Sequence, residues 1–200
     1  FRRVLFRSVP HGPRGHEFAY RRAGSAASRL APGDISETIL GGAKILHVSG
    51  ISQAVMGPAV EHILALARRQ HVSVSYDTNL RLKLWPLEQA RAAIHAGVAQ
   101  ADIVFTSIEE AETLTGRDDP TLIADFYLGL GPRVILVKLG AKGVFVVAEG
   151  QARHIAGHKV AAVDATGAGD TSIATSSGIA ASAKRIARPA AAVSSTECAK

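Results

Sequence analysis

Apolar positions between residues 44 and 148 follow two periods. Short runs of β-branched and aromatic residues predict strands, and apolar residues spaced three and four apart between them predict helices. The expected strands are residues 44–49, 72–76, 102–105, 133–139 and 144–148. The expected helices are residues 57–70, 87–100, 108–114 and 119–128. Because strands that alternate with helices form βαβ units, the pattern predicts an α/β fold with a mostly parallel sheet flanked by helices.

One edge of the expected sheet is antiparallel. The strands at 133–139 and 144–148 have only a glycine-containing turn between them, which is too short for a crossover helix. They are therefore expected to form a hairpin, which residues 151–155 and 158–163 would extend. The sequence shows no internal repeat and no linker between domains after residue 31, so one domain is expected.

The length and composition fit one globular domain. The chain has 200 residues, 47% of them hydrophobic, and no apolar run near the ~20 residues that a membrane-spanning helix needs. Its single cysteine, Cys198, excludes an internal disulfide framework and a cysteine-based zinc site. The eight histidines show no metal-ligand spacing, and no G-x-S-x-G elbow indicates a serine hydrolase.

The net charge of +6 first suggests a nucleic-acid or membrane partner. Residues 1–30 hold seven arginines and one glutamate, and residues 171–200 hold four basic residues and one acidic residue. Residues 31–170 are mildly acidic, with 12 basic and 15 acidic side chains. We therefore expect neither a nucleic-acid nor a membrane partner. Residues 1–15 are expected to be a non-native or disordered basic lead-in, with a polyanion-binding arm as the alternative, and the Ala/Ser-rich residues 172–200 an atypical tail.

The most informative motif is VDATGAGDT at residues 163–171. Gly167 and Gly169 let successive backbone N–H groups converge at the start of an expected helix, which favours an anion site. Asp170 would lie beside that site, where a carboxylate suits proton abstraction better than static anion binding. The alternative is a glycine-rich turn in which Asp170 is an N-terminal helix acid. The sequence has no Walker loop, and no G-x-G-x-x-G follows its first expected strand.

This motif resembles the signature of the PfkB (ribokinase-like) family of carbohydrate kinases. The resemblance implies that Asp170 is the base that deprotonates the acceptor hydroxyl. It also implies that the amides of Gly167, Ala168 and Gly169 form the anion hole for the transferred phosphoryl group. Asp164 then belongs to the segment that helps to hold a monovalent cation such as K⁺. The implied cofactors are ATP and Mg²⁺.

VKLGAKG, at residues 137–143, resembles the nucleotide-binding strand and turn of the same family. Lys138, Gly140 and Gly143 occupy the motif positions. Glycines there would let a nucleotide approach the backbone, and the lysine could meet a phosphate group. From the residues alone, a tight hairpin turn is the alternative, and both interpretations can hold together.

SIEEAETLTG, at residues 107–116, resembles the family's N-x-x-E segment followed by LTG. Glu110 then falls at the acidic position associated with Mg²⁺ and phosphate. Ser107 stands where much of the family has Asn, and the resemblance assigns it to cofactor binding. The alternative is that Glu109, Glu110 and Glu112 form a solvated helix face.

YDTNLRLKLWP, at residues 76–86, resembles the D-x-N-x-R segment of the 2-keto-3-deoxygluconate kinases within this family. Arg81 is assigned to the substrate carboxylate, because a guanidinium group can bind a carboxylate with two hydrogen bonds. Asp77 and Asn79 are assigned to the acceptor and phosphate end. The alternative is a plain loop with Asn at a turn.

FAYRRAGSAASRL, at residues 18–30, resembles the substrate strand of the same branch. The alignment places Tyr20 and Arg22 in the substrate site, with Arg21 as an exposed alternative. Two arginines and a tyrosine suit a sugar acid better than a neutral sugar, because a carboxylate needs cationic partners.

The resemblance implies ATP-dependent phosphorylation of 2-keto-3-deoxygluconate to its 6-phosphate, in the cytoplasm. The alternatives are a PfkB kinase for a neutral sugar such as fructose or ribose, and a catalytically incomplete fragment that at most binds nucleotide. A ribokinase-like domain is expected at residues 16–171, incomplete at both ends. The isolated chain is expected to be poorly stable and to have little or no activity. Its oligomeric state is open.

Overall fold

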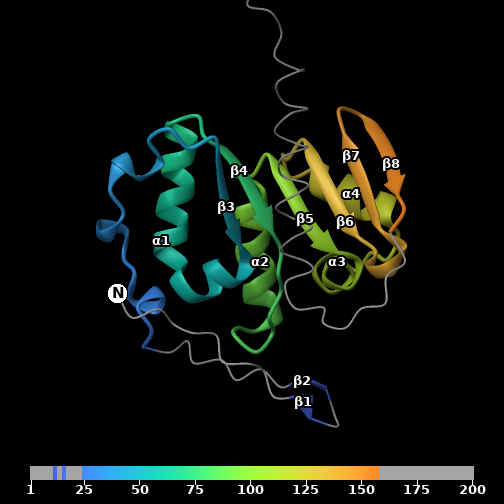
Figure 1. Ribbon diagram of the computed structural model, residues 1–200, viewed down its shortest axis with the longest axis horizontal. Coiled ribbons are helices and arrows are strands. Elements are labelled where there is room, and N and C mark those ends of the chain that lie inside the picture. The colour runs from blue at the N-terminus through green and yellow to red at the C-terminus, as the bar shows by residue number, and fades with distance from the viewer. Residues whose placement is uncertain (1–10, 13–14, 17–23, 158–200) are drawn as a thin grey trace, which may run out of the picture.

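The computed structural model describes residues 11–12, 15–16 and 24–157 of the chain (Figure 1). A small antiparallel pair joins β1 (His11–Gly12) to β2 (Gly15–His16). The strand expected over residues 158–163 lies outside the described residues, as does the segment 172–200. Among the described residues, no helix has the length and apolar character that crossing a membrane requires.

The main sheet has six strands in the order β3-β4-β5-β6-β7-β8. They are β3 (Ile45–Ser49), β4 (Ser73–Asp77), β5 (Ile103–Ser107), β6 (Val134–Lys138), β7 (Val144–Ala148) and β8 (Gln151–Ile155). The first four strands are parallel, and β6, β7 and β8 are antiparallel. The parallel sheet and its antiparallel edge hairpin are both confirmed.

Four helices connect these strands: α1 (Gly50–Arg69), α2 (Leu87–Val98), α3 (Ile108–Thr115) and α4 (Pro120–Leu128). The helix expected from residue 57 is longer in the structure, because a segment from Gly50 precedes it. The helix begins at Gly50, where the Ser49 side chain accepts a hydrogen bond from the N–H of Ser52. Gly57 has non-helical dihedral angles and interrupts α1 before Pro58. Pro58 therefore stands in the first turn of the helical segment that follows this break, as expected.

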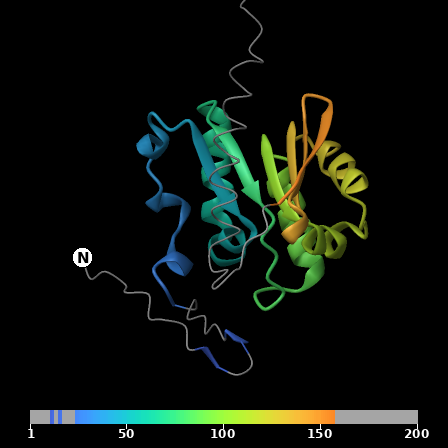
Figure 2. The same cartoon turned by 45° about the vertical axis from the view of Figure 1, so that its right-hand side comes forward.

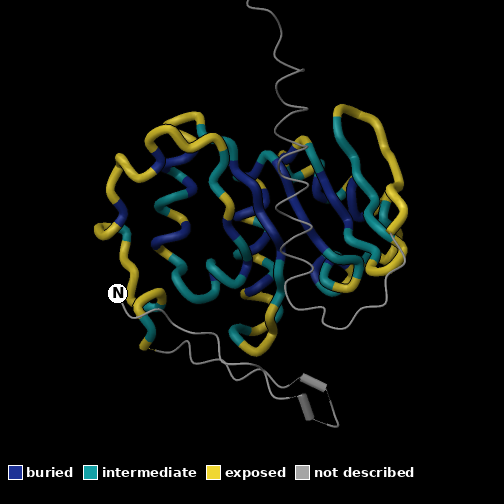
Figure 3. The backbone as a smooth tube through the Cα atoms, in the orientation of Figure 1, coloured by how far each residue is buried: buried dark blue, intermediate teal, exposed yellow. Residues whose placement is uncertain are grey.

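The sheet separates two apolar clusters, because alternate strand residues point to opposite faces. All four helices pack on one face, and the views in Figures 1 and 2 show them along that side of the sheet. The buried strand residues of this face are Val48, Val74, Tyr76, Val104, Ile135 and Val137. The other face carries Ile103, Phe105 and Leu136, and no residue of α1–α4 belongs to that cluster. Figure 3 shows the buried residues concentrated in β4, β5 and β6, whereas β8 is exposed along its length.

An aromatic cluster joins α2 to α4. The ring of His95 lies 5.2 Å from that of Phe126 and 6.1 Å from that of Tyr127, measured between centroids. The Nε2 atom of His95 is buried and has no hydrogen-bond partner among the described residues. Burial lowers the pKa of this imidazole, and the nearby charge of Arg91 lowers it further. The packed state therefore favours neutral His95.

We expect the stability of the protein to fall as the pH drops below about 6.5, the ordinary pKa of histidine. The unfolded chain takes up a proton there that the folded chain, with its lowered His95 pKa, does not, so acid favours unfolding. Thermal unfolding at pH 8 and pH 5.5 measures this difference. In His95→Phe the difference should shrink, whereas His62→Phe on α1 should leave it unchanged. An unaltered difference in His95→Phe would contradict the prediction.

Candidate active site

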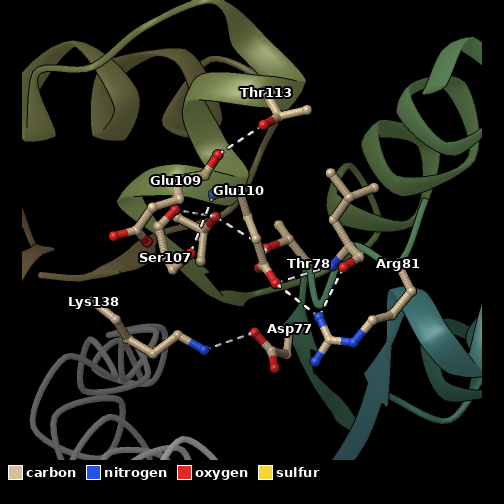
Figure 4. A network of polar contacts seen from close by, with 10 residues as sticks. Asp77, Thr78, Arg81, Ser107, Glu109, Glu110, Thr113 and Lys138 are labelled. Carbon is tan, nitrogen blue, oxygen red and sulfur yellow. Dashed lines mark hydrogen bonds and ion pairs between the residues drawn. The ribbon is translucent and has the colours of Figure 1, made fainter. Parts of the chain in front are cut away.

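Parallel strands bring the predicted site residues to one edge of the sheet. Asp77, Ser107 and Lys138 are the last residues of β4, β5 and β6. Because the carboxyl ends of parallel strands share an edge, these residues lie beside the segment after β4 and the start of α3 (Figure 4). Such edges are the usual ligand sites of open α/β sheets.

A charged pair spans β4 and β6. The Nζ atom of Lys138 lies 3.2 Å from Oδ1 of Asp77, across the intervening strand β5. Asp77 is buried, and a buried carboxylate requires a partner of opposite charge or hydrogen-bond donors. Lys138 therefore has a structural partner at the site, in addition to the nucleotide-binding role expected from its motif.

The carboxylate of Glu110 is the centre of a second network. Its Oε2 accepts a hydrogen bond from the Thr78 hydroxyl at 2.7 Å, and its Oε1 accepts one from the N–H of Leu80 at 3.1 Å. Nη1 of Arg81 lies 3.4 Å from Oε1. Burial raises the pKa of Glu110, and the Thr78 hydrogen bond acts in the opposite direction. Glu110 thus belongs to the site and not to a solvated helix face.

The start of α3 gives Glu110 its position. The Ser107 side chain caps this helix and accepts a hydrogen bond from the N–H of Glu110 at 3.2 Å. Glu109 and Glu112 are exposed, so the solvated-face interpretation fits these two residues alone. Ser107 therefore has a capping role that its motif position did not reveal.

The segment after β4 holds two further predicted site residues. Arg81 is partly exposed, and its Nη1 also donates to the carbonyl oxygen of Leu80 at 2.8 Å. Asn79 has a positive φ of 33°, an uncommon conformation that Asn tolerates better than most residues. Its Oδ1 is buried and has no hydrogen-bond partner among the described residues. A buried amide oxygen normally has such a partner.

The turn between β6 and β7 is the tight hairpin turn expected from its glycines. Gly140 has a φ of 59°, and a Cβ there would meet open space. Gly143 has a φ of 99°, and a Cβ there would overlap the carbonyl oxygen of Ile155. The backbone after β8 therefore requires glycine at position 143, while position 140 leaves room for a ligand near the backbone. Their nucleotide-binding roles remain predictions.

Two residues of this network were missed in the sequence. Thr78 and Thr106 are fully buried, and their hydroxyl oxygens lie 3.0 Å apart. Thr78 stands between two selected residues, and Thr106 directly precedes Ser107, so proximity to the motifs was the available signal. Threonine is common in strands, and a hydroxyl in a motif's neighbourhood does not by itself indicate a site.

Comparison with known proteins decides the family. The model of the pfkB family carbohydrate kinases matches residues 12–198. The chain belongs to the PfkB family. It is 36% identical over 159 residues to 2-dehydro-3-deoxygluconokinase from Thermoproteus tenax, which covers 76% of this chain and 47% of that protein. It is 34% identical over 161 residues to fructokinase-2 from Solanum lycopersicum, which covers 78% of this chain and 48% of that protein.

A solved PfkB structure has the same fold. The PfkB protein from Polaromonas sp. JS666 superimposes with a TM-score of 0.73 at 37% sequence identity, over 80% of this chain and 54% of that one. This likeness confirms the expected ribokinase-like fold. The chain spans about half the length of the curated relatives that it matches.

The other predicted PfkB site residues lie outside the described residues. They are Tyr20 and Arg22 of the substrate strand, and Asp164, Gly167, Ala168, Gly169 and Asp170 of the VDATGAGDT motif. The described part therefore brings together Asp77, Arg81, Glu110 and Lys138, and the roles of the VDATGAGDT residues stay predictions.

PfkB kinases use ATP and Mg²⁺, and the described site has oxygen atoms that suit the metal. A carboxylate has about four lone-pair sites, and three donors contact Glu110, which leaves one site on Oε2. Oδ1 of Asn79 is a second oxygen without a partner among the described residues. No group of three or more His, Cys, Asp or Glu side chains forms a metal site within the described ranges. This fits Mg²⁺, which usually takes one or two protein carboxylates together with substrate phosphates.

Proposed function

We propose that this PfkB protein is an ATP-dependent kinase that phosphorylates a sugar acid, 2-keto-3-deoxygluconate, on its terminal hydroxyl to give the 6-phosphate. The observation that supports this most directly is the charged cluster at the carboxyl ends of β4, β5 and β6. It puts the guanidinium group of Arg81 next to the carboxylate of Glu110. One cluster thus offers a cation for an acidic substrate and an anion for a metal-bound phosphate (Figure 4).

The nucleotide is assigned to the β5 and β6 side of the cluster. Glu110 would meet Mg²⁺ and the phosphates, while Ser107, Lys138, Gly140 and Gly143 would bind the nucleotide. Mg²⁺, when bound, neutralises charge on the transferred phosphoryl group. In the structure, Nζ of Lys138 lies 3.2 Å from Oδ1 of Asp77, and the second lone pair of Glu110 Oε2 has no donor among the described residues.

Proton transfer and charge stabilisation are assigned to the VDATGAGDT motif. Asp170 would take the proton of the acceptor hydroxyl, and the amides of Gly167, Ala168 and Gly169 would stabilise the developing phosphoryl charge. Asp164 would help to hold a monovalent cation such as K⁺. In such a reaction the protein contributes chiefly positioning and electrostatic stabilisation.

The substrate carboxylate is assigned to Arg81 and Arg22, with Tyr20 beside them. Asp77 and Asn79 would support the acceptor and phosphate end. A kinase for a neutral sugar is the second candidate, because a fructokinase is 34% identical to the chain and a 2-dehydro-3-deoxygluconokinase 36%. These similar identities do not distinguish the two substrates. The assignment to a sugar acid therefore rests on the two arginines, which suit a carboxylate better than a neutral sugar.

Phosphorylation rates on different acceptors test the proposal. Coupled assays with ATP and Mg²⁺ should give the highest kcat/KM with 2-keto-3-deoxygluconate, and lower values with fructose and ribose. A higher kcat/KM for fructose or ribose would favour the second candidate and overturn the sugar-acid assignment. Absence of nucleotide-dependent turnover with every acceptor would favour the catalytically incomplete fragment over an active kinase.

Replacement of Arg81 tests the specificity residue directly. A charge-assisted hydrogen bond contributes about 1.5–3 kcal/mol, so Arg81→Gln should raise the KM for the sugar acid by about 10–100-fold. The KM for fructose should change much less, because fructose has no carboxylate. Arg153→Gln on the exposed strand β8 is the matched control and should leave both values unchanged. Equal losses with both sugars would show that Arg81 does not read the carboxylate.

A further inference from the structure

The two oxygens of Glu110 are held by one short stretch of chain. Thr78, Leu80 and Arg81, all within four residues, supply the three donors. Oε1 accepts hydrogen bonds from the N–H of Leu80 and from the guanidinium group of Arg81. Oε2 accepts a hydrogen bond from the Thr78 hydroxyl alone, so Thr78 fills one lone pair of Oε2 and holds this end of the carboxylate.

Thr78 is itself fixed more firmly than any other donor in this set. It is fully buried, and its N–H donates to the carbonyl oxygen of Phe105 at 2.9 Å. Its hydroxyl oxygen lies 3.0 Å from that of Thr106; because the Thr78 proton goes to Glu110, the Thr106 hydroxyl is the donor in this contact. Both side chain and backbone of Thr78 are thus tied to β5 and to the turn into α3.

Arg81 differs from Thr78 in being able to leave Glu110. Its side chain is 43% exposed, and its contact with Oε1 is longer, at 3.4 Å. An arginine that binds a substrate carboxylate has to change partners, and an exposed side chain can do so at little cost. The hydrogen bond from Thr78, by contrast, is shorter, at 2.7 Å, and comes from a fully buried side chain.

We propose that Thr78 is a positioning residue, which holds Oε2 of Glu110 so that its second lone pair stays available to metal-bound phosphate. The proposal rests on the proposed function, in which Glu110 meets Mg²⁺ and the nucleotide. Thr78 touches neither substrate nor nucleotide in it and acts only through Glu110. The residues that hold and orient a metal-binding group affect metal affinity strongly when replaced, typically by 10–100-fold.

Mg²⁺-dependent nucleotide binding tests the role without needing turnover. Isothermal titration of the chain with the ATP analogue AMP-PNP, with Mg²⁺ and then with EDTA, gives the gain in affinity that Mg²⁺ provides. Thr78→Val should reduce this gain about 10-fold, and Thr78→Ser, which keeps the hydroxyl, should restore most of it. Affinity in EDTA should not change in either variant.

Two controls separate positioning from general loss of stability. Ser75→Ala removes a buried hydroxyl from β4, the strand that directly precedes Thr78, on a residue that is hydrogen-bonded to His47. It should lower the melting temperature and leave the Mg²⁺-dependent gain unchanged. Glu110→Gln should abolish most of the gain, since it removes the charge that Thr78 is proposed to orient.

Each result supports or overturns the proposal. If Glu110→Gln loses the gain but Thr78→Val keeps it, Thr78 does not position the carboxylate, and the assignment of Glu110 stands. If Glu110→Gln keeps the gain, the metal assignment of Glu110 fails and the positioning role fails with it. If Thr78→Ser loses as much as Thr78→Val, the hydroxyl is not what matters, and the proposal is overturned.

Discussion

Asp170→Asn should lower kcat for sugar phosphorylation by about 10²–10⁴-fold, the contribution typical of a positioned general base. Asparagine keeps the shape of the side chain but cannot accept the proton of the acceptor hydroxyl. Nucleotide affinity should be preserved, because the neighbouring amides of Gly167, Ala168 and Gly169 are proposed to bind the phosphoryl group through the backbone. Initial rates and AMP-PNP titrations on the same preparations measure both quantities.

A control acid makes this result specific. Asp125 is exposed on α4, and Asp125→Asn should leave kcat unchanged. Near-normal turnover in Asp170→Asn would exclude Asp170 as the base. A parallel loss of nucleotide affinity would instead show that the carboxylate supports binding, and the assignment of proton transfer to this residue would then be wrong.

The fold was predictable from the chain because its signals are local. Strands β3 to β7 follow short apolar runs, and a turn of a few residues between β6 and β7 leaves only an antiparallel pairing. The first part of α1 was missed for a physical reason. Pro58 marks the first turn of the helical segment that follows the break at Gly57, but seven helical residues precede that break.

The part of the site formed by charged residues at the ends of parallel strands was predictable from the sequence. Asp77 and Lys138 are 61 residues apart in the chain, yet both end parallel strands, so their meeting follows from the topology. The partners of Glu110 were not predictable in this way. Thr78 is 32 residues from Glu110 in the chain and 28 residues from Thr106. Only the register of β4 against β5 brings Thr78 into contact with these two side chains.

Gly50→Ala should destabilise the protein by about 1–3 kcal/mol, the usual cost of overpacking a filled site. A Cβ at this position would overlap the carbonyl oxygen of Thr78 and lie 3.3 Å from Cδ1 of Ile94. Backbone atoms cannot move aside as a side chain can, and the N–H of Thr78 is bonded to Phe105. Urea denaturation of the variant and of the unaltered protein measures the change in unfolding free energy.

Helix propensity alone predicts the opposite effect on stability, so the two explanations can be distinguished. Alanine is about 0.8–1 kcal/mol more favourable than glycine inside a helix, so without the close approach Gly50→Ala would be neutral or stabilising. Gly33→Ala is the matched control, since a Cβ there meets nothing within 4 Å. Any shift of Thr78 that accommodates the new methyl group also displaces the donor to Glu110. Gly50→Ala should therefore weaken Mg²⁺-dependent nucleotide binding as well as stability, which a packing defect confined to α1 and α2 would not do.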